Sequence, residues 1–264
     1  MTPILKRKRT RLLFKFINNS SNIFYMKTLK KRMLIVILAT FSISCSAQKS
    51  KEKHLFILSC QSNMELLRPK ESFTPELIKK FGKKNVIVVQ FAKGSQSIRK
   101  WYKGWKPAKE KESKAAPYLY DSLMIKVKKA IHKKEIATVT FIWMQGERDA
   151  RKSRGAVYEK SLIGLHKQLS DDLGRIDVNF IIGRLSDFGI EKTTHPDWSM
   201  IRDIQVKVAE SNDRFGWIDT DDLNTGINRQ GKKIKNGIHM TAIGYVVMGE
   251  RFAKKAIQLI ENNR

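Results

Sequence analysis

The chain has 264 residues, of which 52 are Lys or Arg and 25 are Asp or Glu, giving a formal net charge of +27. This length suffices for one domain with a real hydrophobic core, and two cysteines exclude a disulfide-rich scaffold. The lysines are spread over predicted helices and loops, without a zinc-finger, RNP or helix-turn-helix motif. We therefore interpret the positive charge as a solvated lysine-rich surface and expect no nucleic-acid partner.

The N-terminal segment has the pattern of a secretion signal. Basic residues at 27–32 precede an apolar run at 33–41, and small residues at 45–47 offer a cleavage site. The apolar run is too short to cross a bilayer comfortably, so we expect no membrane span. Cleavage before Gln48 would export the mature protein to the periplasm or the medium of a bacterium.

This pattern divides the chain into residues 1–47, an N-terminal extension with the signal, and residues 48–264, a single folded domain. Residues 1–47 carry ten Lys or Arg and no acidic residue, so their removal lowers the net charge from +27 to +17. Met26 is an alternative start, and lipidation of Cys45 in a bacterial lipoprotein is the alternative to cleavage before residue 48. After that cleavage only Cys60 remains, which excludes an intrachain disulfide.

Apolar runs typical of buried strands alternate with amphipathic stretches along the domain. We expect strands at residues 55–59, 86–91, 137–143, 178–182 and 215–218. We expect helices at residues 119–131, 158–169, 196–210 and from 242 onward, the second ending at Gly174 and the last capped by Thr241. Residues 66–80, 99–117 and 184–197 are expected to be loops that set substrate choice. The alternation predicts an α/β fold in which helices cover both faces of a parallel sheet.

A serine follows the first predicted strand. The apolar run at residues 55–58 stops at Ser59, and Ser62 comes three residues later. Ligands of parallel α/β sheets bind beyond the carboxyl ends of the strands, so Ser62 is a candidate nucleophile. The alternative is that it merely caps the next helix.

A second polar cluster follows the third predicted strand. The amide of Gln145 can donate to a developing oxyanion, and Glu147 supplies an acid two residues later. Glu147 and Asp149 are also spaced as a candidate glycosidase pair. The alternative for both acids is a structural one, an ion pair with Arg148 or a role at a helix start.

The third cluster ends in a histidine just before the last predicted helix. His239 is the best candidate general base, because its loop is expected at the same sheet edge as the other two clusters. His195, in a loop before Pro196, is its only competitor. The remaining histidines lie at a strand start, at a helix end and beside an apolar helical face.

Four blocks now stand in order along the chain, at residues 61–64, 94–98 with Trp101, 143–149 and 237–245. Together they resemble the sialate O-acetylesterase and acetylxylan esterase group, carbohydrate esterase family six, within the SGNH hydrolases. The resemblance spans about residues 53–258. It implies a flavodoxin-like three-layer α/β/α sandwich with a five-stranded parallel sheet, the SGNH hydrolase fold. It also implies removal of O-acetyl groups from carbohydrates without a metal or another cofactor.

The resemblance assigns roles to individual residues. Ser62 is the implied nucleophile and His239 the implied base. The implied oxyanion donors are the backbone N–H groups of Ser62 and Gly94 and the side chain of Gln145. Since the predicted strands end at one edge of the sheet, these residues are expected to share one pocket.

Other residues are candidate substrate contacts. Gln61, Asn63 and Trp101 belong to the matching blocks and are expected to contact the sugar. Trp101 and its neighbour Trp105 could instead fold back as anchors of their loop. Arg184 is a candidate contact for an acidic sugar, as is Arg68, although surface roles are the alternative for both.

The chain departs from the family pattern at three positions. Cys60 stands where the family usually has glycine, and Ser95 replaces the second glycine of the second block. Asn236 replaces the acid three residues before His239, and such a change in a serine protease costs about 10⁴ in kcat. Three outcomes are open: Glu147 orients the imidazole, which we favour, Asn236 does so itself, or catalysis is impaired.

Two functions therefore compete. The first is a serine esterase that removes O-acetyl groups from carbohydrates, with sialic acid and xylan-type glycans as alternative substrates. The second is a catalytically impaired glycan-binding protein that keeps the esterase fold. The sequence gives no indication of oligomeric state.

Overall fold

A computed structural model describes residues 52–108 and 112–263. The predicted secretion signal, with the alternative start at Met26 and the candidate lipidation site at Cys45, lies outside these residues. Within them, no helix combines the length and the apolar character needed to cross a bilayer.

Five parallel strands form the central sheet, in the order β2-β1-β3-β4-β5. Their bounds are Lys53–Cys60 for β1, Val86–Ala92 for β2, Ile136–Met144 for β3, Asn179–Gly183 for β4 and Phe215–Ile218 for β5. Each of the five predicted strands is therefore confirmed, and the strand directions confirm the predicted parallel sheet. The three central strands are almost entirely buried, which explains why their sequences are continuous apolar runs rather than alternating ones.

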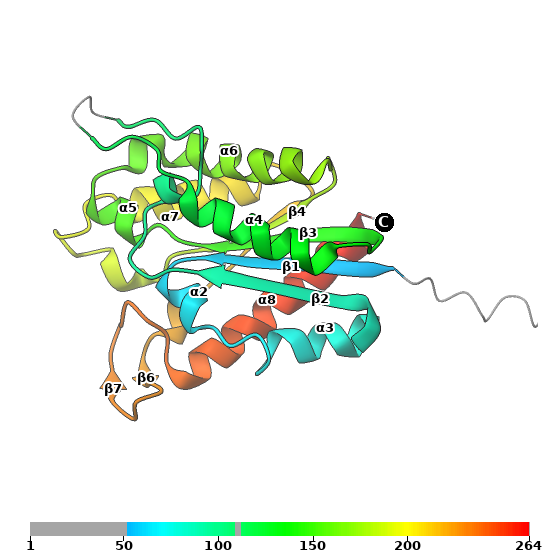
Figure 1. The fold of residues 1–264 in the computed structure, drawn as a ribbon. Coiled ribbons are helices and arrows are strands. Elements are labelled where there is room, and N and C mark those ends of the chain that lie inside the picture. The colour runs from blue at the N-terminus through cyan, green and yellow to red at the C-terminus, as the bar shows by residue number, and fades with distance from the viewer. Residues whose placement is uncertain (1–51, 109–111, 264) are drawn as a thin grey trace, which may run out of the picture. The chain divides into compact units, whose positions relative to one another are not determined.

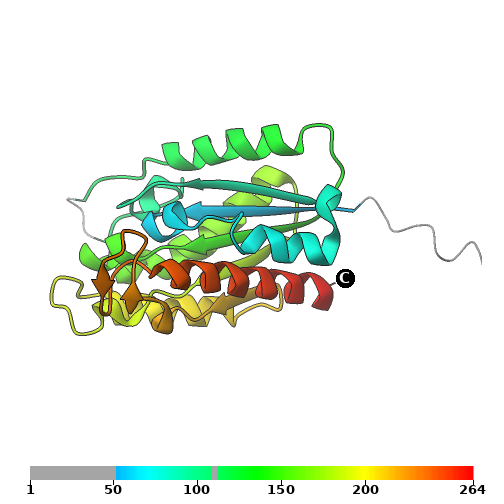
Figure 2. The same cartoon turned by 90° about the horizontal axis from the view of Figure 1, so that it is seen from below.

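Helices cover both faces of this sheet (Figures 1 and 2). One face carries α4 (Tyr118–Ile131), α5 (Glu147–Arg151), α6 (Gly155–Leu173) and α7 (Trp198–Ala209). The other carries α2 (Ser62–Leu66), α3 (Phe73–Phe81) and α8 (Ala242–Asn262). Each layer has its own apolar core against the sheet. The result is the predicted three-layer α/β/α sandwich.

Short elements connect these layers. A two-stranded antiparallel hairpin, β6 (Gly226–Ile227) with β7 (Lys233–Ile234), precedes α8. Single 3-10 turns lie at η1 (Lys83–Asn85), η2 (Ile98–Lys100), η3 (Asp187–Gly189) and η4 (Asp221–Leu223).

The structure corrects one expected loop. Residues 66–80 contain α3, whose Phe73 and Leu77 are fully buried one helical turn apart. Pro75 lies in the first turn of this helix, where a backbone N–H has no intrahelical acceptor, so the proline does not break it. Gly82 ends the helix with a φ of 83°.

The tryptophans of the expected 99–117 loop pack into the core. Trp101 is 0% exposed and Trp105 is 3% exposed. Trp101 meets Phe91 and Trp143 edge-on, with ring centroids 5.9 and 5.7 Å apart. Trp101 thus has no surface to offer a sugar, and the two rings fold back as anchors of their loop.

Candidate active site

The strand-to-helix turn presents Ser62. Strand β1 ends at Cys60, and Ser62 is the first residue of α2. Cys60 adopts a φ of 129°, a region that favours glycine, so this is the position where the family pattern has glycine for a conformational reason. The Cys60 side chain is fully buried, and burial raises the pKa of its thiol. A cysteine is therefore accommodated beside Ser62 without opening the core.

Glu147 holds this turn on both sides of the serine. Its carboxylate accepts a hydrogen bond from Nε2 of Gln61 and another, of 3.2 Å, from Nδ2 of Asn63. The preceding Gly146 has a φ of 155°, and a Cβ there would lie 2.7 Å from the Ile201 side chain. That glycine lets strand β3 turn sharply into α5 and aim Glu147 at the serine turn.

The Glu147 carboxyl group is an unusual acid. It is 5% exposed, and burial raises its pKa to about 7, although the hydrogen bonds it accepts oppose the rise. Both of its oxygens are occupied by Gln61 and Asn63. We predicted that Glu147 orients His239; the structure instead assigns its hydrogen bonds to the serine turn.

His239 lies on the loop just before α8. Thr241 caps that helix by accepting a 2.8 Å hydrogen bond from the N–H of Gly244, and Met240 is buried beneath it. Partial desolvation lowers the pKa of the His239 imidazole below 6.5, which favours the neutral form that a general base needs.

Ser62 and His239 line one pocket of about 190 Å³. The two residues come from opposite ends of the domain sequence, and the parallel sheet brings them together at the carboxyl edge. The pocket is otherwise lined by Gln61, Ser95, Glu147, Arg148, Arg151, His195 and Ile238. We expected one hydroxyl, one imidazole and the Gln145 amide in a common pocket; the hydroxyl and the imidazole line it, and Gln145 does not.

Among the residues that the structure describes, no acid supports the imidazole of His239. Asn236 has a φ of 43°, and its Oδ1 accepts a 3.1 Å hydrogen bond from Asn224. Its backbone N–H donates to Oγ1 of Thr225 at 2.9 Å. Across residues 52–108 and 112–263, no hydrogen bond joins the His239 ring to another group. The asparagine stabilises its own loop rather than the histidine.

Of the predicted oxyanion donors, Gly94 lies beside the serine but its N–H already has an acceptor. Gly94 lies against the serine, since a Cβ on it would come within 3.7 Å of the Ser62 Cβ. However, its N–H donates a 2.8 Å hydrogen bond to Oε2 of Glu65. An acetyl oxyanion must displace that carboxylate before it can use the N–H of Gly94.

Gln145 faces the core instead of the pocket. Its side chain is fully buried, and Nε2 donates to Oδ2 of Asp149 at 2.5 Å and to the carbonyl of Gln96 at 3.4 Å. Its Oε1 accepts from the hydroxyl of Tyr158 at 3.1 Å. With both ends of its amide engaged, this side chain does not act as the third donor in this conformation.

Asp149 is a structural residue that the sequence pattern left ambiguous. It is 0% exposed and accepts from the Ser97 hydroxyl at 2.5 Å and the Ile98 N–H at 2.9 Å, besides Gln145. It thereby ties the second block to the third. A glycosidase role is excluded, because neither oxygen faces the pocket. The spacing of four positions between Gln145 and Asp149 was the only local sign of this contact.

The competing histidine also reaches the pocket. The His195 ring packs edge-on against Phe188 and Trp198, with centroids 5.7 and 5.3 Å away, and its Nδ1 lies 2.9 Å from Oγ1 of Thr194. Burial and the nearby Arg151 lower its pKa. Its ring is wedged between aromatic groups, so it forms a wall of the site.

The arginines predicted for an acidic sugar are engaged elsewhere. Arg184 pairs with Asp219 and Asp221, and Arg68 pairs with Glu71. Arg148 and Arg151, which the sequence analysis did not propose as ligand contacts, line the pocket instead. Their spacing of three residues at the start of a helix was the available signal.

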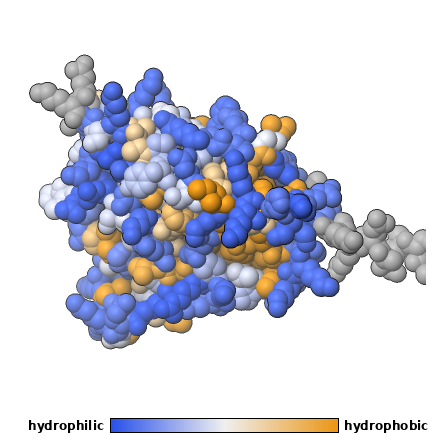
Figure 3. All heavy atoms as spheres, viewed as in Figure 1, coloured by the Kyte–Doolittle hydropathy of each residue, from blue (hydrophilic) through white to orange (hydrophobic). Residues whose placement is uncertain are grey.

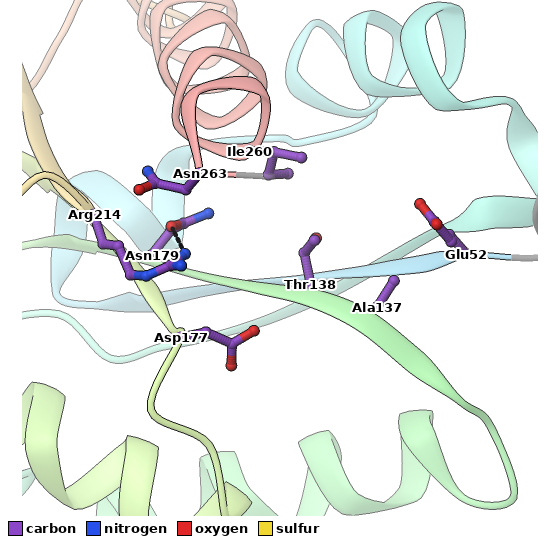
Figure 4. Close-up of a pocket in the computed structure, with 8 residues that line it drawn as sticks. All are labelled: Glu52, Ala137, Thr138, Asp177, Asn179, Arg214, Ile260 and Asn263. Carbon is purple, nitrogen blue, oxygen red and sulfur yellow. Dashed lines mark hydrogen bonds between the residues drawn. The ribbon is translucent and has the colours of Figure 1, made fainter.

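A second pocket, of about 330 Å³, opens at the amino ends of the strands (Figure 4). It is lined by Glu52, Ala137, Thr138, Asp177, Asn179, Arg214, Ile260 and Asn263, and has no serine, cysteine or histidine in its wall. Figure 4 shows its polar side chains spread along the pocket rather than converging. In the described part of the chain, no three His, Cys, Asp or Glu side chains are grouped to hold a metal.

Comparison with known proteins agrees with this fold. No curated protein matches the sequence. A protein from Arabidopsis thaliana has the same fold, with a TM-score of 0.58 and 16% identity over 81% of this chain and 100% of its own. A carbohydrate acetylesterase from Xanthomonas citri also has a TM-score of 0.58 and 16% identity, over 78% of this chain and 56% of its own.

The sequence profile of one family covers most of the domain. It is described as carbohydrate esterase, sialic acid-specific acetylesterase, and it matches residues 65–258. The match begins three residues after Ser62 and includes the segments that carry Glu147 and His239. The chain is therefore a carboxylic ester hydrolase that belongs to the sialic acid-specific acetylesterase family of carbohydrate esterases.

Proposed function

We propose that this esterase removes O-acetyl groups from carbohydrates through an acetyl-Ser62 intermediate. The observation that carries the proposal is the common pocket of Ser62 and His239 at the carboxyl edge of the sheet. Family membership supports the acetyl ester and the carbohydrate. The lowered pKa of His239 supports its role as the base.

The chemistry follows the double-displacement route of serine hydrolases. His239 takes the Ser62 proton as Oγ attacks the acetyl carbonyl carbon, and the carbonyl oxygen becomes an oxyanion. The backbone N–H groups of Ser62 and Gly94 stabilise that oxyanion once the Glu65 carboxylate has moved away. The sugar oxygen then leaves with the proton held by His239.

Water completes the cycle. It attacks the acetyl carbon of acetyl-Ser62 while His239 takes one of its protons. The second tetrahedral intermediate collapses, Ser62 Oγ recovers its proton from the imidazole, and acetate leaves. The products are the free sugar hydroxyl and acetate, and no cofactor is consumed.

Acetate release tests this proposal. The purified protein should hydrolyse 4-nitrophenyl acetate and release acetate from acetylated sugars. Ser62→Ala should lower kcat by about 10⁴-fold or more, as loss of a nucleophilic serine does elsewhere. Ser122→Ala, on α4 away from the pocket, is the matched control and should keep full activity. Full activity in the Ser62 variant would overturn the proposal.

A glycan-binding protein without turnover is the second candidate. It is favoured by the lack of a supporting acid at His239 in the described residues. Calorimetry would then show sugar binding that Ser62→Ala leaves unchanged, together with no acetate release. Turnover that depends on Ser62 rules this candidate out.

We further propose that the enzyme acts outside the cytoplasm. The basic and apolar segments within residues 1–47 support export. Mass spectrometry of the protein expressed in a bacterium with its native N-terminus should give a mature chain that begins at Gln48. A lipid on Cys45 would support the lipoprotein alternative, and an intact chain would contradict both.

A further inference from the structure

Two arginines of the pocket wall differ from the other arginines of the domain. Arg148 and Arg151 follow the buried Glu147 on α5 and line the pocket of Ser62 and His239. They are three positions apart, so they lie on one side of the helix. They are the only arginines of the described chain whose side chains have no hydrogen bond, ion pair or cation–π contact.

The other described arginines all have partners. Seven pair with carboxylates: Arg68, Arg154, Arg175, Arg184, Arg202, Arg229 and Arg251. Two more donate hydrogen bonds, Arg99 to the carbonyl of Lys114 and Arg214 to Asn179. Arg148 is half-buried and nevertheless unpaired, although a guanidinium that loses water gains most from a paired anion.

Among the described residues, no carboxylate forms an ion pair with either guanidinium group. Glu147 is the one acidic residue in the pocket wall, and both of its oxygens are held by Gln61 and Asn63. Lys192 adds another positive charge nearby, since it and Arg151 both act on His195. The cavity therefore carries a net positive charge beside the reacting serine, because the single Glu147 carboxyl, with a pKa of about 7, offsets at most one of these charges.

We propose that Arg148 and Arg151 form a specificity subsite for a carboxylate of the substrate. The preferred substrate is then an O-acetylated sugar acid rather than a neutral acetylated sugar. Guanidinium groups match the fork of a carboxylate and bind it through paired, charge-assisted hydrogen bonds. This inference rests on the proposed function for the reaction itself, but assigns a new role to two residues outside the nucleophile and base.

The test compares one acetylated sugar in a charged and an uncharged form. The probes are 9-O-acetyl-N-acetylneuraminic acid and its C1 methyl ester, with acetate release as the readout. The parent enzyme should have a lower KM for the acid. Arg148→Ala with Arg151→Ala should raise that KM about tenfold to hundredfold, as expected for lost charge-assisted hydrogen bonds, and leave the KM of the methyl ester unchanged.

A matched variant separates a local subsite from long-range attraction. Arg68→Ala with Arg214→Ala removes the same charge at two positions that do not line the pocket, and should keep the preference for the acid. Arg148→Lys with Arg151→Lys keeps the charge without the planar guanidinium group and should retain part of the preference. Equal KM values for both probes in the parent, or an unchanged preference in the double alanine variant, would overturn the subsite.

A binding measurement keeps this inference separate from the proposed reaction. In the Ser62→Ala background, calorimetry with the same two probes should show tighter binding of the acid, lost on removal of both arginines. If this holds while acetate release is absent, the subsite stands and the proposed function fails. Equal binding of both probes, with or without the arginines, refutes the subsite even if the parent is an active esterase.

Discussion

The serine turn and the histidine loop meet in one pocket, yet they are held very differently. The turn around Ser62 is fixed by a buried carboxylate that bonds to both neighbours of the serine. Asn63 extends this network by donating to the Ile238 carbonyl at 3.1 Å and accepting from the Tyr245 hydroxyl at 3.0 Å. The His239 ring has no such partner in the described chain. The nucleophile is preorganised, and the base is positioned by its backbone alone.

Among the changes that leave Ser62 and His239 in place, the largest effect is expected from removing the support of the serine turn. Glu147→Gln replaces two acceptor oxygens by one oxygen and an NH₂ group, which would face the donor of Gln61 or Asn63. The resulting displacement of Ser62 should lower kcat roughly 100-fold while the protein stays folded. Steady-state kinetics with 4-nitrophenyl acetate measure the loss in kcat, and a circular dichroism spectrum shows whether the variant is folded. An unchanged kcat would mean that the turn around Ser62 keeps its conformation without the hydrogen bonds to Glu147.

The next effect has the opposite sign. Asn236→Asp places a carboxylate three residues before His239, where it can orient the imidazole and stabilise its charged form. Because the reverse change costs about 10⁴ in a serine protease, kcat should rise at least about tenfold. Asn224→Asp, which puts a carboxylate at the partner of Asn236, is the control and should give no gain. A fall in kcat on Asn236→Asp would show that another group supports the imidazole.

A smaller gain is expected at the oxyanion site. Glu65→Ala removes the carboxylate that occupies the N–H of Gly94 beside the serine. Freeing one hydrogen-bond donor should raise kcat about threefold to tenfold. Glu71→Ala, on the exposed stretch that follows α2, is a charge-matched control. A lower kcat in the Glu65 variant would indicate that its carboxylate shapes the loop rather than blocks it.

The smallest effect concerns pH and stability. The pKa of Glu147 is about 7 in the fold, above its ordinary value of 4.5, so the folded state binds more protons than the unfolded state between these values. Stability is therefore highest below about pH 4.5 with respect to this group, and falls as the pH rises toward 7. Thermal unfolding should show a decline of a few degrees over that range in the parent, absent in Glu147→Gln. If the unfolding temperature of the parent and of Glu147→Gln changed with pH in the same way, the raised pKa of a buried Glu147 would be contradicted.

Activity should follow the histidine instead. The pKa of His239 lies below 6.5, so kcat/KM should fall only as the pH drops under that value and the base becomes protonated. Asn236→Asp should move this acidic limb upward, because a nearby carboxylate favours the imidazolium. If the acidic limb of the pH profile of kcat/KM does not move in Asn236→Asp, the new carboxylate does not contact the His239 imidazole.

The fold was predictable because its signals are local. Buried parallel strands are continuous apolar runs, and the amphipathic helices α4 and α8 repeat their apolar residues every three or four positions. Helix α3 was missed, although its Pro75 lies in the first turn, where a proline does not break a helix. The pocket shared by Ser62 and His239 followed from the parallel topology alone.

The finer assignments of the site depended on long-range contacts that no spacing reveals. Gln145 turns inward because Asp149 and Tyr158 hold its amide, and both partners are identified only in three dimensions. Glu147 turns toward residues 61–63 rather than His239 for a similar reason. Burial decides such contacts, because a polar group removed from water takes whichever partner packing brings near.

Cys60 is the only cysteine of the described residues, and its thiol can report on the motion of the serine turn. Its sulfur is sealed from solvent two positions ahead of Ser62, so a maleimide or disulfide reagent reaches it only when the strand end swings open. In protein lacking residues 1–47, every labelled molecule therefore records one opening of that turn. The labelling rate, with and without a bound sugar acid, would time how often the catalytic serine leaves its working position.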